Sequence, residues 1–251
     1  MINTISIITP TYNSEKFILD TIISVVNQSY VNWEMIITDD CSTDNTYALV
    51  KKFIVNDDRI IIHKLKTNSG SAIARQNSLS HAKGNYIAFL DSDDTWLRHK
   101  LKTQLNFMRE KKVSISFTSY FVMNEKGASL NKTIKAVEKV NYHEYMKNTI
   151  IGMSTSMIDT SIVGHVVFKN IRTRQDTYLW ISLLKQGHMA YGISEPLANY
   201  RLRGDSISAN KIKSALQVWN LYFNFEKLGI IKSLYYFIFY LFNAVKKRVL
   251  K

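Results

Sequence analysis

The chain has 251 residues, of which 46% are hydrophobic and 12% aromatic, enough to bury the core of one sizeable domain. Its formal net charge of +13 favours polyanionic partners, namely nucleic acid, anionic lipid or phosphate-bearing small molecules. The single cysteine, Cys41, excludes an intramolecular disulfide, and the first residues show no signal-peptide pattern, so we expect a cytoplasmic protein.

Strands and helices are predicted to alternate in the first part of the chain. Apolar runs predict strands at 5–9, 33–38, 60–63 and 86–90, the first of them closed by Pro10. Helical spacing predicts three intervening helices: the first capped by Ser14, the second by the polar groups of residues 42–44, and the third reaching Ala82. This alternation predicts an α/β fold with a Rossmann-like, mostly parallel sheet and helices on both faces.

Polar loops follow three of the predicted strands, at 10–13, 39–44 and 91–94. Open sheets of this kind bind ligands beyond the carboxyl ends of their strands. We therefore expect the three loops to meet at one edge of the sheet and to form a binding site there.

The third loop places Asp91, Asp93 and Asp94 within four residues. Such crowded carboxylates favour a bound Mg²⁺ or Mn²⁺, which takes one or two carboxylates together with substrate phosphates. The alternative is a helix cap, for which one acidic residue would be enough.

Asp39 and Asp40 in the second loop are open to the same two interpretations. An aspartate carboxylate can accept a hydrogen bond from a nucleobase N–H, while the ring of Tyr12 can stack on that base. The alternative is that the two acids only stabilise a turn or cap a helix.

Four segments in this order resemble the family 2 glycosyltransferases: residues 7–13, residues 39–44, the set Asn68, Gly70, Ala74, Arg75 and Asn77, and the run Asp91-Ser92-Asp93-Asp94. The resemblance covers about the first 110 residues and implies an inverting enzyme of the GT-A fold. It implies that the nucleotide-sugar is bound by Pro10, Tyr12, Asn13, Asp39, Asp40, Asn68, Arg75, Asp91, Ser92, Asp93 and Arg203, and that Mn²⁺ or Mg²⁺ is held among Asp91, Asp93 and Asp94.

The second half contains a run, Arg174 to Trp180, that is similar to the family's Glu-Asp-x-x-x-Trp element. The resemblance implies that Asp176 is the catalytic base, with Gln175 in place of the usual acidic neighbour. Without the resemblance, Asp176 would be interpreted as an exposed acidic residue at the start of a helix. Residues 200–208 resemble the family's closing loop, in which many members have a histidine at the position of Arg203. Arg203 either contacts the diphosphate or, like Arg201, is a solvated surface charge.

The C-terminal part combines aromatic and basic residues. The uncharged run Ser233–Val245 is shorter than the roughly 20 residues that span a bilayer. Flanking residues Lys232, Lys246, Lys247, Arg248 and Lys251 favour a helix lying on an anionic membrane surface, and the alternative is a helix packed on the catalytic domain. We expect a catalytic domain at 1–225, with a nucleotide-binding part at 1–110 and an acceptor part at 111–225, followed by an amphipathic tail at 226–251.

Together these features predict a metal-dependent glycosyltransferase on the inner face of a bacterial plasma membrane. The resemblance implies a UDP-sugar donor and a glycan or polyprenyl-linked acceptor hydroxyl, in the synthesis of a surface polysaccharide such as O-antigen, capsule or teichuronic acid. One alternative is a sugar nucleotidyltransferase, although its Gly-rich signature loop is missing near Pro10. Another is a non-enzymatic binder of membrane or nucleic acid, but no nucleic-acid-binding motif is evident, so we expect no nucleic acid partner.

Overall fold

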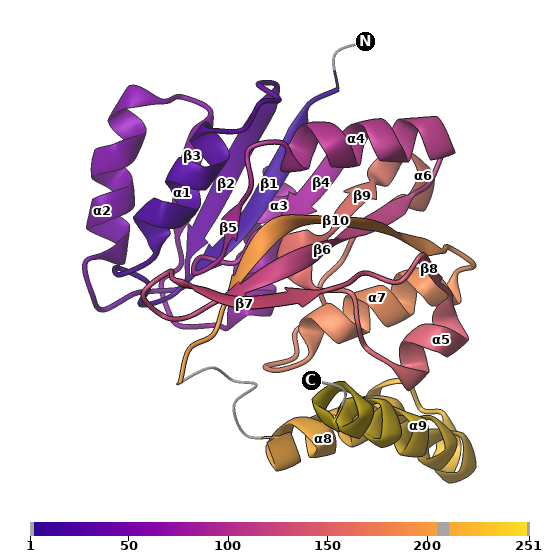
Figure 1. Ribbon diagram of the computed structural model, residues 1–251. Helices are drawn as coiled ribbons and strands as arrows, with labels where there is room; N and C mark the ends of the chain where they lie inside the picture. The colour runs from indigo at the N-terminus through magenta and orange to yellow at the C-terminus, as the bar shows by residue number, and fades with distance from the viewer. Residues whose placement is uncertain (1–2, 205–210, 250–251) are drawn as a thin grey trace.

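The computed structural model describes residues 3–204 and 211–249, and it has a central sheet flanked by helices with a further helical layer beneath it (Figure 1). The strands are β1 (Ile5–Thr11), β2 (Trp33–Asp39), β3 (Ile60–Lys64), β4 (Tyr86–Phe89), β5 (Thr95–Trp96), β6 (Ile115–Met123), β7 (Ser129–Ile134), β8 (Lys139–Val140), β9 (Met157–Asp159) and β10 (Ala190–Arg201). The helices are α1 (Ile18–Val26), α2 (Thr46–Phe53), α3 (Ser71–Ser80), α4 (Lys100–Lys111), α5 (Tyr142–Lys147), α6 (Thr160–Val163), α7 (Gln175–Lys185), α8 (Lys211–Asn220) and α9 (Gly229–Val249). Shorter helical segments are η1 (Ile54–Asn56), η2 (Met153–Thr155) and the π-helical η3 (Leu221–Phe225).

The sheet has the strand order β3-β2-β1-β4-β9-β6-β10-β5, with β7 and β8 pairing at its side. Strands β1 to β4 are parallel, as their alternation with helices predicts. The sheet becomes mixed beyond β4, because β9 runs antiparallel to both β4 and β6. The α/β prediction is confirmed, and its parallel part is the half that carries the three polar loops.

Strand β1 continues past Pro10, where the sequence predicted its end. Pro10 is opposite Thr38 of β2, whereas pairing with β4 stops at Ile8. The carbonyl of Ile8 points towards β4 and accepts the N–H of Leu90. Backbone groups two residues apart in a strand point to the same side, so the nitrogen of Pro10 also faces the β4 side, beyond the end of β4. The missing N–H of proline therefore breaks no hydrogen bond of the sheet.

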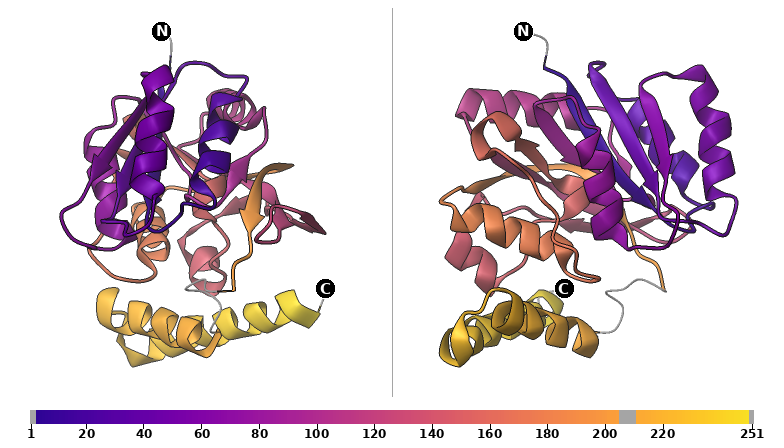
Figure 2. Two further views of the ribbon diagram at one scale, coloured as in Figure 1. Left: turned by 90° about the vertical axis from the view of Figure 1, so that its left-hand side faces the viewer. Right: turned by 180° about the vertical axis from the view of Figure 1, so that it is seen from behind.

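Two hydrophobic clusters cover the two faces of the parallel strands. Alternate residues of β1 enter each, with Ile5 and Ile7 on one face and Ile8 on the other. Helices α1, α2 and α4 pack on the first face, and α3, α5 and α7 on the second, which is the near side in the right-hand view of Figure 2. This double burial explains why β1, β2 and β4 are apolar runs rather than alternating ones.

The expected helix boundaries need two corrections. Ser14 does not cap α1 with its side chain, because its hydroxyl group is hydrogen-bonded to Ser92, while its carbonyl accepts the N–H groups of Phe17 and Ile18. Helix α3 ends at Ser80, before Ala82. At the start of α2, the N-cap residue is Asn45, whose side chain makes no capping hydrogen bond, and of residues 42–44 it is Asp44 whose carboxylate accepts the N–H of Thr46.

The C-terminal helices α8, η3 and α9 form a layer under the rest of the protein (Figure 2, left). One side of α9 packs inward: Ser233 and Tyr236 are buried, and the Tyr236 hydroxyl is 2.5 Å from His143 Nδ1 on α5. Within residues 3–204 and 211–249, no helix has the combination of length and apolarity needed to cross a membrane. Lys251 and residues 205–208 of the expected closing loop lie outside the described residues, and the domain boundary expected at 225 stays a prediction.

Candidate active site

The three polar loops meet at one edge of the sheet, as the strand order predicts. The N–H of Asn13 donates to Ser42 Oγ at 3.0 Å, and Asn13 Oδ1 accepts from the N–H of Thr43 at 2.9 Å. The hydroxyl groups of Ser14 and Ser92 are 2.8 Å apart, joining the first loop to the third. Asn13 and Ser92 thus hold the loops together, and Ser92 is buried in doing so.

Asp39 and Asp40 are both buried and both stabilise the loops through backbone N–H groups. Asp39 accepts the N–H and the hydroxyl of Ser42. Asp40 accepts the N–H groups of Ser69 and Gly70, each at 2.7 Å, and so holds the turn that starts α3. Their observed role is to hold the backbone of the second loop and of the turn before α3, and direct contact with a nucleobase stays a prediction.

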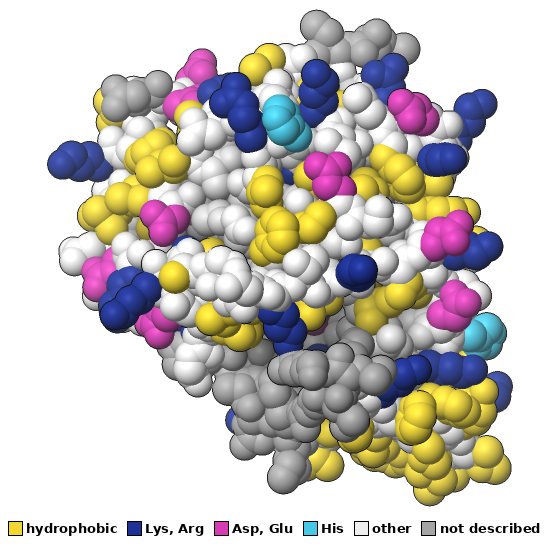
Figure 3. Space-filling view, in the orientation of Figure 1, with side chains coloured by type: hydrophobic (Ala, Val, Ile, Leu, Met, Phe, Trp, Pro, Cys, Tyr) yellow, Lys and Arg dark blue, Asp and Glu magenta, His cyan; other side chains and the backbone are white. Residues whose placement is uncertain are grey.

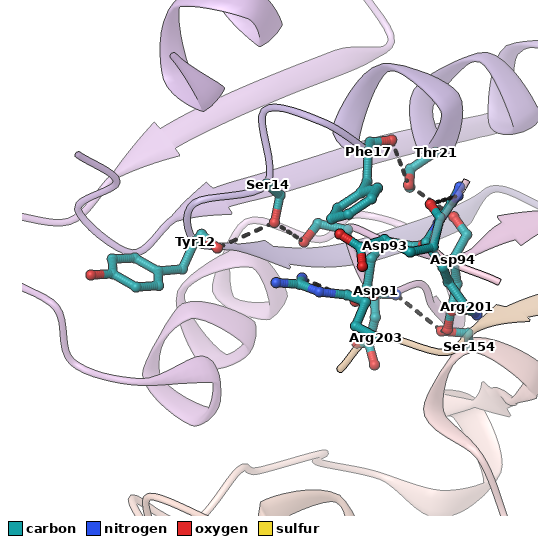
Figure 4. A network of polar contacts seen from close by, with 12 residues as sticks. Tyr12, Ser14, Phe17, Thr21, Asp91, Asp93, Asp94, Ser154, Arg201 and Arg203 are labelled. Carbon is teal, nitrogen blue, oxygen red and sulfur yellow. Dashed lines mark hydrogen bonds and ion pairs between the residues drawn. The ribbon is translucent and has the colours of Figure 1, made fainter. Parts of the chain in front are cut away.

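The residues expected around the base differ in exposure. Pro10 is buried in β1, whereas the Tyr12 side chain is 45% exposed. Figure 4 shows its ring pointing away from the carboxylates of the third loop. Asn68 donates to the carbonyl of Asp40 and accepts from Arg172 Nη2 at 2.8 Å. An open aromatic face beside fixed polar groups is suited to stacking on a base.

Asp91 is paired with the buried Arg75 of α3, at 2.5 Å between Oδ1 and Nη2. The Arg75 guanidinium also lies over the ring of Phe168, 5.8 Å from its centre. Its Nε and Nη1 have no hydrogen-bond partner among the described residues. A buried guanidinium with unused N–H groups beside a half-exposed carboxylate is the arrangement that a phosphate group would complete.

Asp93 and Asp94 have different surroundings although they are adjacent. Asp93 Oδ2 lies 3.3 Å from Arg203 Nη1, and burial together with Asp91 raises the pKa of Asp93. Both oxygens of Asp94 are occupied, one by the Ser154 hydroxyl and the other by the N–H of Arg201. Burial, Asp93 and Asp91 raise the pKa of Asp94 well above its usual value.

These differences bear on the expected metal site. Asp91 and Asp93 keep part of their carboxylates exposed, at 34% and 26% of the side chain. Asp94 is 2% exposed and serves as a support. Among residues 3–204 and 211–249, no group of three or more acidic, His or Cys residues is arranged to hold an ion by itself. A hard cation with two carboxylates and substrate phosphates as ligands fits this donor set.

Arg201 and Arg203 are not solvated surface charges. Arg201 is buried, and its guanidinium donates to the carbonyls of Asp93 and Glu125. Both guanidinium groups lie 5.0 Å from the centre of the Phe17 ring (Figure 4). The end of β10 and the residues just after it therefore bring two positive charges against the third loop from far along the chain.

Asp176 lies in the first turn of α7, half-buried, with Thr177 Oγ1 3.4 Å from its Oδ1. Its neighbour Gln175 donates from Nε2 to Ser71 Oγ at 2.7 Å, at the start of α3. Arg75, which holds Asp91, is one turn further along α3. Helix α3 therefore contacts both the residue before Asp176 and the side chain of Asp91, and the placement of the Asp176 carboxylate opposite the third loop stays a prediction.

A small hollow of about 70 Å³ opens beside Asp91 and Asp94. It is lined by Tyr120, Gly152, Met153, Ser154, Thr155, Ala198 and Tyr200. Burial and Asp94 raise the pKa of Tyr120 to about 12, so its hydroxyl keeps its proton and can donate a hydrogen bond. Tyr120 and Ala198 were not candidates from the sequence, because they are brought to the site by the long-range pairing of β6 with β10.

A second hollow lies between α1 and α2, lined mainly by Leu19, Val26, Leu49 and Phe53. Its one carboxylate, Asp57, is paired with Arg59. Apart from Asp57 and Lys52 its lining is apolar, and none of the three polar loops contributes to it, so we place the reaction at the third loop.

Comparison with known families decides what this site belongs to. The model of Glycosyl transferase family 2 matches residues 6–173. The chain belongs to this family. It is therefore a glycosyltransferase, and family 2 enzymes invert the configuration at the sugar. The alternatives of a sugar nucleotidyltransferase and a non-enzymatic binding protein are thereby wrong.

Similar proteins extend over nearly the whole chain. The chain is 49% identical to the putative teichuronic acid biosynthesis glycosyltransferase TuaG of Bacillus subtilis, covering 98% of this chain and 97% of that one. It is 36% identical to the Escherichia coli UDP-Glc:alpha-D-GlcNAc-diphosphoundecaprenol beta-1,3-glucosyltransferase WfgD, covering 97% and 94%.

Solved structures confirm the GT-A fold. S. aureus TarS in complex with UDP-GlcNAc matches with a TM-score of 0.70 and 21% identity, covering 88% of this chain and 67% of that one. The mannosyltransferase PcManGT from Pyrobaculum calidifontis, in complex with GDP-Man and Mn²⁺, matches with a TM-score of 0.71 and 17% identity, covering 92% and 66%.

Proposed function

We propose that this enzyme transfers a sugar from a UDP-sugar to a hydroxyl of a polyprenyl-linked or glycan acceptor during synthesis of a bacterial surface polysaccharide, with Asp176 as the base. The observation that carries the proposal is that α3 contacts both Asp91 and the residue that precedes Asp176 in the chain. Ser71 contacts the neighbour of Asp176, and Arg75 contacts Asp91. The named acceptor of WfgD is a diphosphoundecaprenol-linked sugar, and the similarity to that enzyme supports a lipid-linked acceptor here.

The donor would lie across the three loops. Tyr12 stacks on the base, the walls of the base pocket are shaped by Asp39 and Asp40, and the unused N–H groups of Arg75 meet the diphosphate. The UDP-GlcNAc complex of the structurally similar TarS supports a uridine nucleotide.

Asp91 and Asp93 would hold Mn²⁺ or Mg²⁺, since their carboxylates are partly exposed and repel each other. Asp94 supports the loop from below through Ser154 and Arg201. When bound, the divalent cation supplies positive charge against the diphosphate. The Mn²⁺ in the PcManGT complex supports a divalent metal at a site of this fold.

The reaction is a single displacement at the anomeric carbon. Asp176 accepts the proton of the acceptor hydroxyl as its oxygen forms the new bond to that carbon. The bond from the anomeric carbon to the phosphate oxygen breaks on the opposite face, so the configuration inverts. Arg75 and Arg203 stabilise the negative charge that develops on the departing diphosphate.

We further propose that the enzyme works at the inner face of the plasma membrane, bound through α9. The outward side of α9 exposes apolar residues at helical spacing, namely Ile231, Leu234, Ile238, Phe242 and Val245. Figure 3 shows hydrophobic side chains gathered over these C-terminal helices, with Lys and Arg side chains directly above them. An apolar stripe next to basic residues suits the surface of an anionic bilayer, where a polyprenyl-linked acceptor would be found.

The assignment of the base is tested with Asp176→Asn. The variant keeps the shape of the side chain but cannot take the proton at neutral pH, so we expect kcat to fall by at least about a hundredfold. Affinity for UDP, measured by isothermal titration calorimetry, should stay within about twofold of wild type. Transfer by D176N at the wild-type rate would refute the assignment.

A further inference from the structure

The turn that starts α3 is held from the donor side of the site by Asp40, whose two oxygens accept the N–H groups of Ser69 and Gly70 at 2.7 Å. Gly70 has φ +93, a conformation in which residues with a side chain are strained. The position of this turn is therefore set by the same loop that shapes the wall of the base pocket.

The chain leading to Asp176 is attached to the other side of this turn. Gln175 Nε2 donates to Ser71 Oγ at 2.7 Å, and Arg172 Nη2 donates to Asn68 Oδ1 at 2.8 Å. The Arg172 side chain also lies against Gly70, where a Cβ would be 3.5 Å from Arg172 Cδ. Gln175 is 9% exposed, so of these two hydrogen bonds the one between Gln175 and Ser71 is the one shielded from water.

The backbone just before Asp176 needs such an attachment. Arg174 has φ 62 and ψ 21, the left-handed conformation, which costs a residue with a side chain about 1–2 kcal/mol. Its guanidinium donates to the carbonyl of Ser214 at 3.1 Å, on α8. The conformation that aims the first turn of α7 is thus maintained by side-chain contacts on both sides of it, to α3 and to α8.

We propose that Gln175 is a positioning residue for the reaction: its hydrogen bond to Ser71 fixes the first turn of α7, and with it the Asp176 carboxylate, to the α3 turn held by Asp40. The inference rests on the proposed role of Asp176 as base. This positioning role explains why the amide of Gln175 can replace the acidic residue that is usual in the family, because the role requires only one hydrogen bond with the Ser71 hydroxyl. Gln175 donates to Ser71 Oγ, and a glutamate would accept from the same hydroxyl.

The test compares Gln175→Leu, Gln175→Glu, Ser71→Ala and the double variant Q175L/S71A. We expect Q175L to lower kcat for transfer about 10-fold to 100-fold, as expected for a displacement of a reacting group by about 1 Å, with the KM for donor and the affinity for UDP within about twofold of wild type. S71A should lower kcat in the same direction. The double variant should be no slower than Q175L, because both changes remove one contact. Q175E should recover most of the loss.

Gln28→Leu is the matched control. Gln28 is a buried glutamine whose Nε2 donates to the carbonyls of Ser24 and Leu97 and whose Oε1 accepts the N–H of Leu101, so its hydrogen bonds involve neither α3 nor α7. Q28L should lower the melting temperature while kcat per folded enzyme stays at the wild-type value. The positioning role would be overturned if Q175L had the wild-type kcat, or if the fold-loss in kcat of the double variant equalled the product of the two single losses. D176N measured in parallel separates the two proposals, since its continued turnover would refute the base assignment instead.

Discussion

The membrane proposal can be tested on α9 without disturbing its packed side. Ile231, Ile238 and Phe242 lie within about 40° of one another around the helix, and their side chains are 81%, 55% and 65% exposed. Tyr236 and Ser233 are on the opposite, buried side. Substitution of the three exposed residues by serine removes apolar surface while leaving the contacts of α9 with α5 in place.

The expected effect follows from the apolar area that would enter the bilayer interface. Full burial of an isoleucine or phenylalanine side chain contributes about 1.5–3 kcal/mol. Scaled by the exposed fractions of the three side chains, the loss on substitution is about 4 kcal/mol. A loss of this size weakens partitioning to vesicles about a thousandfold.

Co-sedimentation with vesicles containing anionic lipid measures this partitioning directly. The matched control replaces Ile23, Val31 and Val55, which are also exposed but belong to the nucleotide-binding half. We expect the control to bind vesicles like wild type and the α9 variant to stay in the supernatant, with unchanged melting temperatures in both. Equal vesicle binding by the two triple variants would refute the reasoning.

Two further predictions concern buried and metal-binding groups. Burial lowers the pKa of Lys100 well below its usual value, and contact with the Trp96 ring, 3.7 Å from Nζ, offsets only about 2 kcal/mol of that penalty. Between this lowered pKa and the unfolded value of about 10.4, the folded state binds fewer protons than the unfolded chain, so wild-type stability rises with pH there, by up to about 1.4 kcal/mol per unit. In urea unfolding, the stability of Lys100→Met relative to wild type should fall from pH 7 to 9.5, and a constant difference would contradict the lowered pKa. For Asp93→Asn, kcat/KM at saturating Mn²⁺ should drop at least about a hundredfold, and an unchanged Mn²⁺ titration of activity would exclude Asp93 as a ligand.

The parallel half of the fold and the meeting of its loops could be predicted from the sequence. Apolar runs separated by helical spacing define βαβ units, and parallel strands place their carboxyl ends at one edge. Residues 10–13, 39–44 and 91–94 therefore came together as expected. The signal is local in each case, because a strand and the loop after it are neighbours in the chain.

The sequence did not distinguish the roles of chemically identical residues. Asp93 and Asp94 are adjacent, yet Asp93 stays partly exposed and Asp94 is buried against Ser154 and Arg201. Ser154 and Arg201 are about 60 and 107 positions from Asp94 along the chain. Contacts over such separations depend on how β9 and β10 pair with the rest of the sheet.

The sequence by itself determined the α/β class, the order of the binding loops and the amphipathic character of α9, since each follows from residue type and short-range periodicity. Only the tertiary structure decided which carboxylates are exposed, which side of α9 is free, and that Gln175 is attached to Ser71. These outcomes depend on packing between segments far apart in the chain, where burial and hydrogen-bond partners are set by neighbours that no local pattern specifies.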